Sequence, residues 1–218
     1  KGFAGIENMN VQGVRLSHDG GLVVTFQGRN VFPYQVAVGR FSFDGTTEWL
    51  KVNRAHHWPG VGPDGRIYVP VARITRDEEF VAGTREKLDC KYGAVFQEGV
   101  AVLSPKGEVL HEFWMDDAVR HSDRQGLAYA VRDDCDPYHV NHVVPLTAAA
   151  AERLPGTREG DLLVSLRSSS SLVVLDQETG TIVTSLAGPM VAQHSPEILP
   201  DGSIGLFDNL GGIDTENG

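Results

Sequence analysis

Short apolar runs separated by tight-turn dipeptides fill most of the chain, and this pattern is typical of an all-β protein. The dipeptides suit hairpin turns because glycine adopts a positive φ at no steric cost. They are Asp19-Gly20, Asp44-Gly45, Asp64-Gly65, Lys106-Gly107, Thr179-Gly180 and Asp201-Gly202. Strands are expected at 21–27, 35–43, 66–72, 99–104, 109–114, 161–166, 171–175, 181–186 and 203–207.

Other segments depart from the strand pattern. Thr147 is a suitable N-cap for an alanine-rich run that Pro155-Gly156 ends, so a short helical insertion is expected near 147–154. The segment 76–91 is polar and mixed in charge, which favours a long surface loop. The segment 118–130 fits neither a helix nor a strand clearly.

An internal repeat gives the strongest information about architecture. The segment 55–67 aligns with 192–204, and seven of the thirteen aligned positions are identical, including His57 with His194. The offset of 137 residues equals three units of about 46, which is close to the period of four-stranded propeller blades. His139 falls between the two copies at about two such periods after His57.

The spacing of the histidines at whole multiples of the blade period predicts a β-propeller in which histidines far apart in sequence lie close together. The first strand of each blade lines the central channel of a propeller, so equivalent positions on these strands converge near the axis. His57, His139 and His194 are therefore expected to share one site. We expect residues 1–218 to form a single β-propeller domain or part of one.

Composition and charge narrow the partners. Asp and Glu number 29 against 19 Lys and Arg, for a net charge of −10, which argues against nucleic acid and anionic membranes. Hydrophobic residues make up 41% of the chain, which disfavours disorder. No apolar run approaches the roughly 18 residues of a membrane span.

The two cysteines and the chain ends leave alternatives open. Cys90 and Cys135 are too few for a disulfide framework or a metal knuckle, and either one bridge or two buried thiols is compatible with the sequence. The chain begins at Lys1 without Met or signal peptide and ends in polar sequence at Gly218, which we interpret as a processed, trimmed or partial product.

Polar residues in apolar strands are candidates for chemistry. His139 and Asn141 are two apart in a strand-like stretch, which places them on one face and His142 on the other. Arg167 ends an apolar strand and offers a planar fork for an oxyanion. The competing interpretations are a hydrogen-bonded core histidine beside a turn asparagine, and a salt-bridged surface arginine.

Three further features are interpreted conservatively. The serine run 168–171 is expected to be a flexible loop rather than a nucleophile, and no Gly-x-Ser-x-Gly elbow supports a serine hydrolase. His18, His111 and His121 are expected at the surface or in structural roles. Three convergent histidines could hold zinc, but a neighbouring arginine would repel the cation and no acidic residue occupies the matched positions.

Several motifs together resemble the bacterial PAPS-independent arylsulfate sulfotransferases. The matching order is His139-x-Asn141, a strand ending in Arg167, Leu175-Asp176-x-x-Thr179-Gly180, Gln193-His194, and Phe207-Asp208-Asn209. The close match covers 136–209, and the unit 55–67 adds the family's earlier channel histidine. The resemblance implies a six-bladed β-propeller.

The resemblance also implies a mechanism and roles. His194 would accept the sulfuryl group as a sulfohistidine, while Arg167, His139 and Asn141 would bind the sulfuryl oxygens. His57 or His56 would complete the pocket and donate a proton to the leaving phenolate. The implied partners are an aryl sulfate donor and a phenolic or other hydroxyl acceptor, with no cofactor and no metal, in a periplasmic or secreted protein.

Departures from the family pattern keep other functions in view. The length suits four to five blades, the insertion at 145–160 separates Asn141 from Arg167, and the family's tryptophan-rich surroundings of the nucleophile are replaced by 192–196. The alternatives are a non-catalytic propeller that binds a ligand or protein at its channel mouth, and a metal-dependent propeller hydrolase or lyase. Convergence of the histidines around Arg167 would favour the sulfotransferase.

Overall fold

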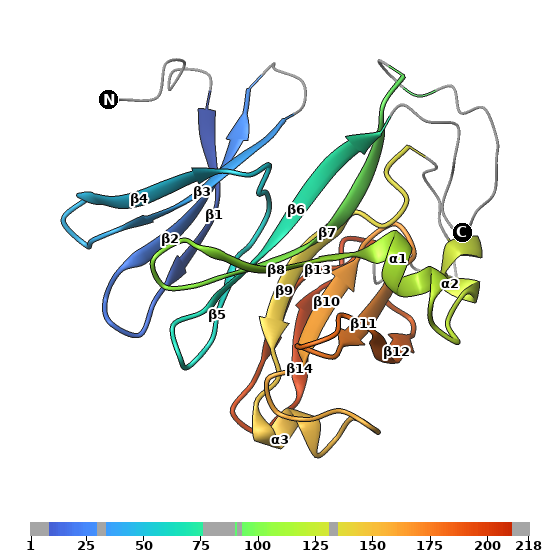
Figure 1. Cartoon of the computed structure of the whole chain (residues 1–218). Helices are drawn as coiled ribbons and strands as arrows, with labels where there is room; N and C mark the ends of the chain where they lie inside the picture. The colour runs from blue at the N-terminus through green and yellow to red at the C-terminus, as the bar shows by residue number, and fades with distance from the viewer. Residues whose placement is uncertain (1–8, 30–33, 76–89, 91–92, 131–134, 211–218) are drawn as a thin grey trace.

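Antiparallel β-sheet makes up most of the computed structural model, which describes residues 9–29, 34–75, 90, 93–130 and 135–210. Within these residues, three four-stranded sheets and one two-stranded sheet follow one another along the chain (Figure 1). Strands that are consecutive in sequence are neighbours in each sheet. Each sheet is therefore a simple meander, the form of a propeller blade.

The elements have the following bounds. The first sheet holds β1 (Met9–Leu16), β2 (Leu22–Gly28), β3 (Gln35–Phe41) and β4 (Thr47–Val52). The second holds β5 (Gly60–Val61), β6 (Ile67–Thr75), β7 (Val95–Leu103) and β8 (Val109–Trp114). The third holds β9 (Val140–Pro145), β10 (Leu162–Leu166), β11 (Ser171–Leu175) and β12 (Ile182–Ala187), and the fourth holds β13 (His194–Ile198) and β14 (Ile204–Phe207). The helices are α1 (Met115–Arg120), α2 (Gly126–Tyr129) and α3 (Ala148–Ala151).

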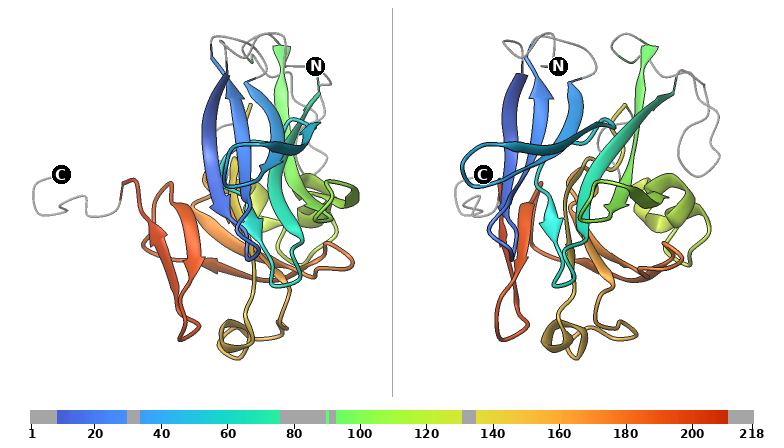
Figure 2. Two further views of the ribbon diagram at one scale, coloured as in Figure 1. Left: turned by 90° about the vertical axis from the view of Figure 1, so that its left-hand side faces the viewer. Right: turned by 60° about the vertical axis from the view of Figure 1, so that its left-hand side comes forward.

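The first strands of the four sheets, β1, β5, β9 and β13, lie together and face a common axis. Trp58, just before β5, forms a parallel bridge with His142 of β9, so these two chain segments run in the same direction. Arg15 of β1 reaches Glu197 of β13 in a two-pronged ion pair of 2.5 and 2.7 Å, and Figure 2 shows β1 and β13 on the same side of the molecule. This arrangement confirms the predicted all-β propeller.

The sequence repeat reappears as a repeated strand register. Val61 pairs with Ile67 between β5 and β6, and Ile198 pairs with Ile204 at the same offset between β13 and β14. Asp64 and Asp201 each accept a hydrogen bond from the backbone N–H two residues later, at 3.0 Å in both turns. The two copies therefore fold as the same hairpin, as the alignment predicts.

Each pair of adjacent sheets encloses its own hydrophobic core. The core between the first and second sheets contains Val23, Val38, Ile67, Val69 and Leu103. The core between the second and third contains Val100, Val102, Met115, Val164 and Val173. The third sheet packs against the fourth through Leu163, Leu172 and Val174. Because β10 and β11 supply residues to two cores, both of their faces are apolar.

All nine predicted strands are present and β9 lies in the stretch described as strand-like, while β1, β4, β5 and β13 have no counterpart among the predictions. The residues of β1 and β4 are mostly exposed or half-buried, and β5 has only two residues, so hydrophobic alternation is weak in all three. The predicted helix is confirmed: the Thr147 hydroxyl accepts a 3.3 Å hydrogen bond from the Ala150 N–H. The ambiguous segment 118–130 contributes to α1 and α2.

The serine run corrects a prediction. Instead of a flexible loop, residues 168–170 lie in a tight turn between β10 and β11 and Ser171 begins β11, and Ser168, Ser169 and Ser171 are buried. The Ser168 hydroxyl donates to the Asp136 carbonyl at 2.9 Å, and the hydroxyls of Ser169 and Ser171 are 2.7 Å apart. Burial with satisfied hydroxyl groups favours one fixed conformation.

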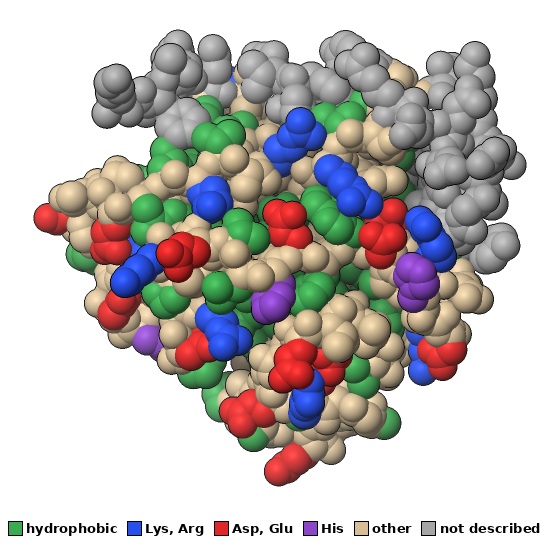
Figure 3. Space-filling view, in the orientation of Figure 1, with side chains coloured by type: hydrophobic (Ala, Val, Ile, Leu, Met, Phe, Trp, Pro, Cys, Tyr) green, Lys and Arg blue, Asp and Glu red, His purple; other side chains and the backbone are tan. Residues whose placement is uncertain are grey.

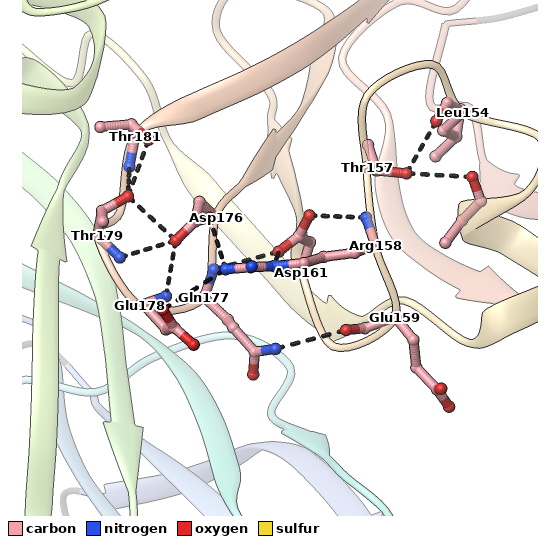
Figure 4. A network of polar contacts seen from close by, with 11 residues as sticks. Leu154, Thr157, Arg158, Glu159, Asp161, Asp176, Gln177, Glu178, Thr179 and Thr181 are labelled. Carbon is pink, nitrogen blue, oxygen red and sulfur yellow. Dashed lines mark hydrogen bonds and ion pairs between the residues drawn. The ribbon is translucent and has the colours of Figure 1, made fainter.

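The insertion that contains α3 is tied to the third sheet by a polar network (Figure 4). Arg158 donates to Asp176 at 2.8 Å and lies 3.5 Å from a carboxylate oxygen of Asp161. Asp176 also accepts the backbone N–H groups of Glu178 and Thr179, both at 2.9 Å. The insertion therefore has a fixed place beside the turn between β11 and β12.

Three remaining expectations have different outcomes. Cys90 and Cys135 form a disulfide, with Cα atoms 5.6 Å apart, so the bridge is the correct alternative. The predicted surface loop at 76–91 lies outside the described residues, apart from Cys90.

Every described helix falls short of the length and apolar character that a bilayer crossing requires. Acidic and basic side chains are interspersed over the face shown in Figure 3.

Candidate functional site

His57, His139 and His194 meet at one end of the inner strands. One ring nitrogen from each lies within 4.8 Å of those of the other two. The ring centroids are 5.0 Å apart for His57 and His139, 5.9 Å for His57 and His194, and 6.1 Å for His139 and His194. His57 and His139 directly precede the inner-strand region of their blades and His194 begins β13, so the predicted convergence is present. All three side chains are half-buried.

The first blade fixes the backbone of His57. The His57 N–H donates to Oε1 of Gln12 at 2.8 Å, and its carbonyl accepts the Thr25 hydroxyl at 2.5 Å. Gly13 permits this close approach, because a Cβ there would lie 2.2 Å from the His57 carbonyl oxygen. His57 has φ of 53°, in the left-handed region that costs most residues free energy and often marks functional sites.

His139 is held by the segment before β9 rather than by the strand itself. It has φ of 47° and precedes Val140, the first residue of β9. Its Nδ1 lies 2.5 Å from Oδ2 of Asp136, which fixes the ring orientation and leaves Nε2 on the other side of the ring. The expectation that His139 alternates with Asn141 and His142 along one strand is therefore wrong. The left-handed backbone of His139 lies outside the extended strand, which begins at Val140.

His194 is oriented by its own blade and by the blade before it. Nδ1 lies 3.1 Å from the Ala192 carbonyl and 2.7 Å from the Asn209 amide nitrogen. The preceding residue, Gln193, is fully buried, and its amide donates to the carbonyl of Ser171 at 2.8 Å. Asn141 donates to the Gln193 carbonyl at 2.8 Å. The chain just before His194 is thus fixed against the third sheet.

Arg167 adds a positive charge to the same space. It directly follows β10, and its backbone N–H donates to the His139 carbonyl at 3.2 Å. The side chain is half-buried, and in the part of the chain that the structure describes no hydrogen bond or ion pair holds the guanidinium. The charge of Arg167 contributes to lowering the pKa of both His57 and His194, so it acts on both rings.

The environment of His56, His57 and His194 favours their neutral form by lowering the pKa of each ring. Burial, assisted by the charges of neighbouring histidines and Arg167, lowers the pKa of His57 well below 6.5. Burial also lowers the pKa of His194, with smaller contributions from His139 and Arg167. The pKa of His56 falls to about 3 because the ring is fully buried. A neutral imidazole has a lone pair, as a nucleophile requires.

The charge distribution favours an anion over a metal cation. His57, His139 and His194 form a triangle, and three histidines in this arrangement can also bind a divalent cation. The guanidinium of Arg167, whose charge adds to the effect of burial on the pKa of His57 and His194, opposes a cation and attracts an oxyanion. Arginine presents several N–H donors in one plane, which suits an anion such as a sulfate ester.

Other residues chosen from the sequence lie behind the triangle or away from it. His56 has no exposed surface, and its Nδ1 lies 2.6 Å from Nδ1 of His57. Asn141 is also fully buried, with its amide nitrogen on Gln193. His18, His111 and His121 are exposed, as expected.

Several residues that orient the histidines were not among the candidates expected from the sequence. Asp136 pairs with His139, Gln12 and Thr25 hold His57, and Glu98 lies beside His56. A carboxylate inside an apolar strand is unusual, so Glu98 among the valines of β7 could have been noticed. The other three sit in segments where polar residues are common, and only their contacts distinguish them.

A cavity of about 440 Å³ lies at the opposite ends of the inner strands. Its lining includes Arg15, Tyr68, Pro145, Glu159 and Glu197. None of the histidines of the triangle lines it. The cavity is therefore separate from the chemistry at the other end.

Several solved structures are similar to this chain in fold. The chain matches a luciferin-regenerating enzyme at 8% identity and a TM-score of 0.52, covering 90% of this chain and 52% of that one. A virginiamycin B lyase from Staphylococcus aureus matches at 10% identity with a TM-score of 0.49, covering 93% and 50%. The WD40 β-propeller domain of Doa1 matches at 9% identity with a TM-score of 0.38, covering 91% and 60%. The chain spans about half the length of the first two structures.

The family comparison is more specific than the fold. No curated protein matches the sequence. The family model described as arylsulfotransferase (ASST) matches residues 20–217, a range that contains the three histidines, Arg167 and every described strand except β1. The chain therefore belongs to the arylsulfotransferase (ASST) family.

Proposed function

We propose that this chain carries the sulfuryl-transfer site of a PAPS-independent arylsulfotransferase. One observation carries the proposal: three half-buried histidines and the unpaired guanidinium of Arg167, among the described residues, converge on one space. Membership of the family supports sulfuryl transfer in general. The aryl sulfate donor, the hydroxyl acceptor and the covalent intermediate are the specific content of the proposal.

His194 is the proposed nucleophile in the first half-reaction. When Nδ1–H donates to the Ala192 carbonyl, the Asn209 amide donates to the same carbonyl, at 2.8 Å, and the lone pair of His194 is on Nε2. Nε2 attacks the sulfur of the aryl sulfate, the N–S bond forms, and the S–O bond to the aryl group breaks. The phenolate departs with the bonding electrons and takes a proton. The product is a sulfohistidine.

Arg167 and His139 are proposed to bind the sulfuryl oxygens. Arg167 donates in-plane N–H groups to the charge on the equatorial oxygens. The Nδ1–H of His139 donates to the Asp136 carboxylate, and this pairing orients the ring so that its Nε2 side is presented to the sulfuryl group. Asn141 acts one step away, by holding the Gln193 carbonyl next to the nucleophile.

The second half-reaction returns the site to its starting state. The oxygen of the acceptor hydroxyl attacks the sulfur, the N–S bond breaks, and His194 regains its lone pair. The hydroxyl proton passes to His57, whose neutral ring accepts it. Donor and acceptor occupy the same place in turn, which is a ping-pong sequence.

Intact-mass spectrometry tests the covalent step. The full protein is mixed briefly with 4-nitrophenyl sulfate, and mass and nitrophenolate release are followed together. We expect the gain of one SO₃ in wild type and in His111→Ala, a control at an exposed histidine away from the triangle. His194→Ala should show neither the added SO₃ nor the rapid initial release of nitrophenolate (the sulfation burst).

Other outcomes select the competing functions. A folded wild-type protein that gives no adduct and no nitrophenolate contradicts the proposal. Tight Zn²⁺ binding that is lost in His194→Ala would then favour a metal-dependent hydrolase or lyase. Ligand binding without turnover would favour a non-catalytic binding module.

A further inference from the structure

Glu98 is a buried carboxyl group that the proposed mechanism does not yet use. It lies in β7, with 1% of its surface exposed, among apolar strand residues. Its Oε2 accepts the backbone N–H of Val140, the residue after His139. Its Oε1 lies 3.6 Å from Nε2 of His56, and neither atom has another hydrogen-bond partner within the described residues. Burial of such a group needs a compensating reason.

The contacts of Glu98 continue to the candidate site. Nδ1 of His56 lies 2.6 Å from Nδ1 of His57. The Nδ1 atoms of both rings are therefore engaged with each other, and Nε2 of His57 is the nitrogen left for a ligand. The chain of polar atoms runs from Glu98 through His56 to His57. A small movement of Glu98 toward His56 would complete it.

The protonation states determine the direction in which protons can move from Glu98 through His56 to His57. Burial, together with the charge of Asp136, raises the pKa of Glu98 well above 4.5, while the Val140 N–H opposes this effect. Glu98 is then a neutral acid: Oε2 accepts from Val140, and the Oε1–H donates to His56. His56 donates from Nδ1 to His57, and His57 carries its proton on Nε2, facing the substrate space.

A neutral His57 cannot supply a proton by itself. Its pKa lies well below 6.5, so near pH 7 it is not an imidazolium, and loss of its single N–H proton would leave an imidazolate. The groups around His56 do not make that ring a proton source either. His139 lowers the pKa of His56, and the remaining polar contact of His56 is with the Val71 backbone. A proton donated from Nε2 must be replaced at Nδ1.

We propose that Glu98, His56 and His57 form a proton relay in which Glu98 stores the proton that the leaving phenolate receives. This inference rests on the proposed sulfuryl transfer. In one shift, the Glu98 proton moves to Nε2 of His56, the His56 Nδ1 proton moves to Nδ1 of His57, and the His57 Nε2 proton moves to the phenolate. Glu98 becomes a carboxylate and both rings stay neutral. The acceptor hydroxyl reverses the shift in the second half-reaction.

Leaving-group dependence separates a relay from a structural role. Glu98 touches no substrate, so it is a positioning residue, and its effect must depend on how much the leaving group needs a proton. Phenolate is a much stronger base than 4-nitrophenolate, so phenyl sulfate needs the proton far more. A general acid contributes about 10²–10⁴-fold to a rate.

Two variants interrupt the relay with little change in shape. Glu98→Gln retains an N–H donor toward His56 but has no proton to release. His56→Gln introduces the residue that the repeat carries at the equivalent position, Gln193. Single-turnover rates of His194 sulfation are measured with both donors in the full protein. In each variant we expect about a 100-fold loss with phenyl sulfate and a loss below about threefold with 4-nitrophenyl sulfate.

The outcomes distinguish failure of the relay from failure of the proposed function. Equal losses with both donors would make Glu98 and His56 structural residues and overturn the relay. If wild type forms no sulfohistidine, ¹⁵N NMR of the histidines decides the relay without turnover. His57 protonated on Nε2 in wild type and in Glu98→Gln supports it, and a proton on Nδ1 of His57 contradicts it.

Discussion

At the scale of single residues, the candidate site combines neutral histidines with one positive charge. Burial removes the charge from His57 and His194, and Arg167 adds to the effect on both. Among the described residues, no acidic side chain forms an ion pair with this guanidinium. An arrangement of this kind attracts an anion while keeping lone pairs available for attack.

Replacement of Arg167 should change both the rate and its pH dependence. His194 attacks only when neutral, so the rate falls as the pH drops through the His194 pKa, which lies below 6.5. Arg167→Gln removes a cation, so this pKa rises and the acid limb moves to higher pH. We also expect kcat/KM to fall about 10²–10³-fold. The measurement is kcat/KM for 4-nitrophenyl sulfate between pH 4.5 and 8.

A matched arginine provides the control for this prediction. Arg153 is exposed, lies just beyond α3, and donates to the Asp201 carbonyl in the turn that follows β13, at the other end of that strand from His194. Arg153→Gln should leave both the rate and the acid limb unchanged. An acid limb that stays in place in Arg167→Gln would show that His194 and Arg167 are not coupled.

At the scale of elements, close contact between inner strands positions the histidines. Gly60 begins β5, and a Cβ at this position would lie 2.3 Å from the Val143 carbonyl oxygen of β9. The parallel bridge between Trp58 and His142 lies next to this contact. Because His57 precedes β5 and His139 precedes β9, the spacing of these two strands sets the spacing of the two rings.

Gly60→Ala should therefore weaken both stability and the site. A methyl group cannot fit against the Val143 backbone, so β5 and β9 must separate, at a cost of about 3 kcal/mol in the free energy of unfolding. Urea unfolding measures this cost, and the sulfation burst should slow as the triangle opens. Gly126→Ala is the control: no atom lies within 4 Å of its added Cβ in α2, and stability should stay equal or rise by up to about 1 kcal/mol. Equal stability of the two variants would contradict this account.

At the scale of the whole molecule, His142 lies where three blades meet. It belongs to β9, pairs with Trp58 before β5, and has its Nε2 3.9 Å from Glu197 of β13. Burial lowers the pKa of His142 to about 4, although Glu197 raises it somewhat. The folded protein therefore favours the neutral ring, whereas the unfolded chain binds a proton near pH 6.5.

Acid should destabilise the molecule through His142. Its contribution to stability is complete above pH 6.5 and is lost as the pH falls toward 4, because the unfolded state then binds the extra proton. Each pH unit in this window is worth about 1.4 kcal/mol, or roughly 3 kcal/mol in all. Urea unfolding of wild type and His142→Leu at pH 7 and pH 4 should show this loss in wild type relative to the variant. Parallel pH profiles would contradict it.

The sequence by itself determined the fold class, the repeat and the identity of the triangle. Strand alternation and turn glycines depend on local backbone preferences, so they are visible without a structure. The identical spacing of His57 and His194 within a 137-residue repeat placed both histidines at the same height in their blades. His139 was also predicted to join them, although its backbone conformation was not.

Only the tertiary structure decided which residues hold the three histidines and which groups set their pKa values and proton paths. Glu98, Gln12 and Asp136 act across blades or through a left-handed turn, and nothing local in the sequence connects them to the histidines. The same holds for the disulfide, since two cysteines 45 residues apart are equally compatible with free thiols until the chain brings them together. Sequence periodicity records what each strand buries, whereas pKa values and proton paths depend on distances that arise only when separate blades pack around one axis.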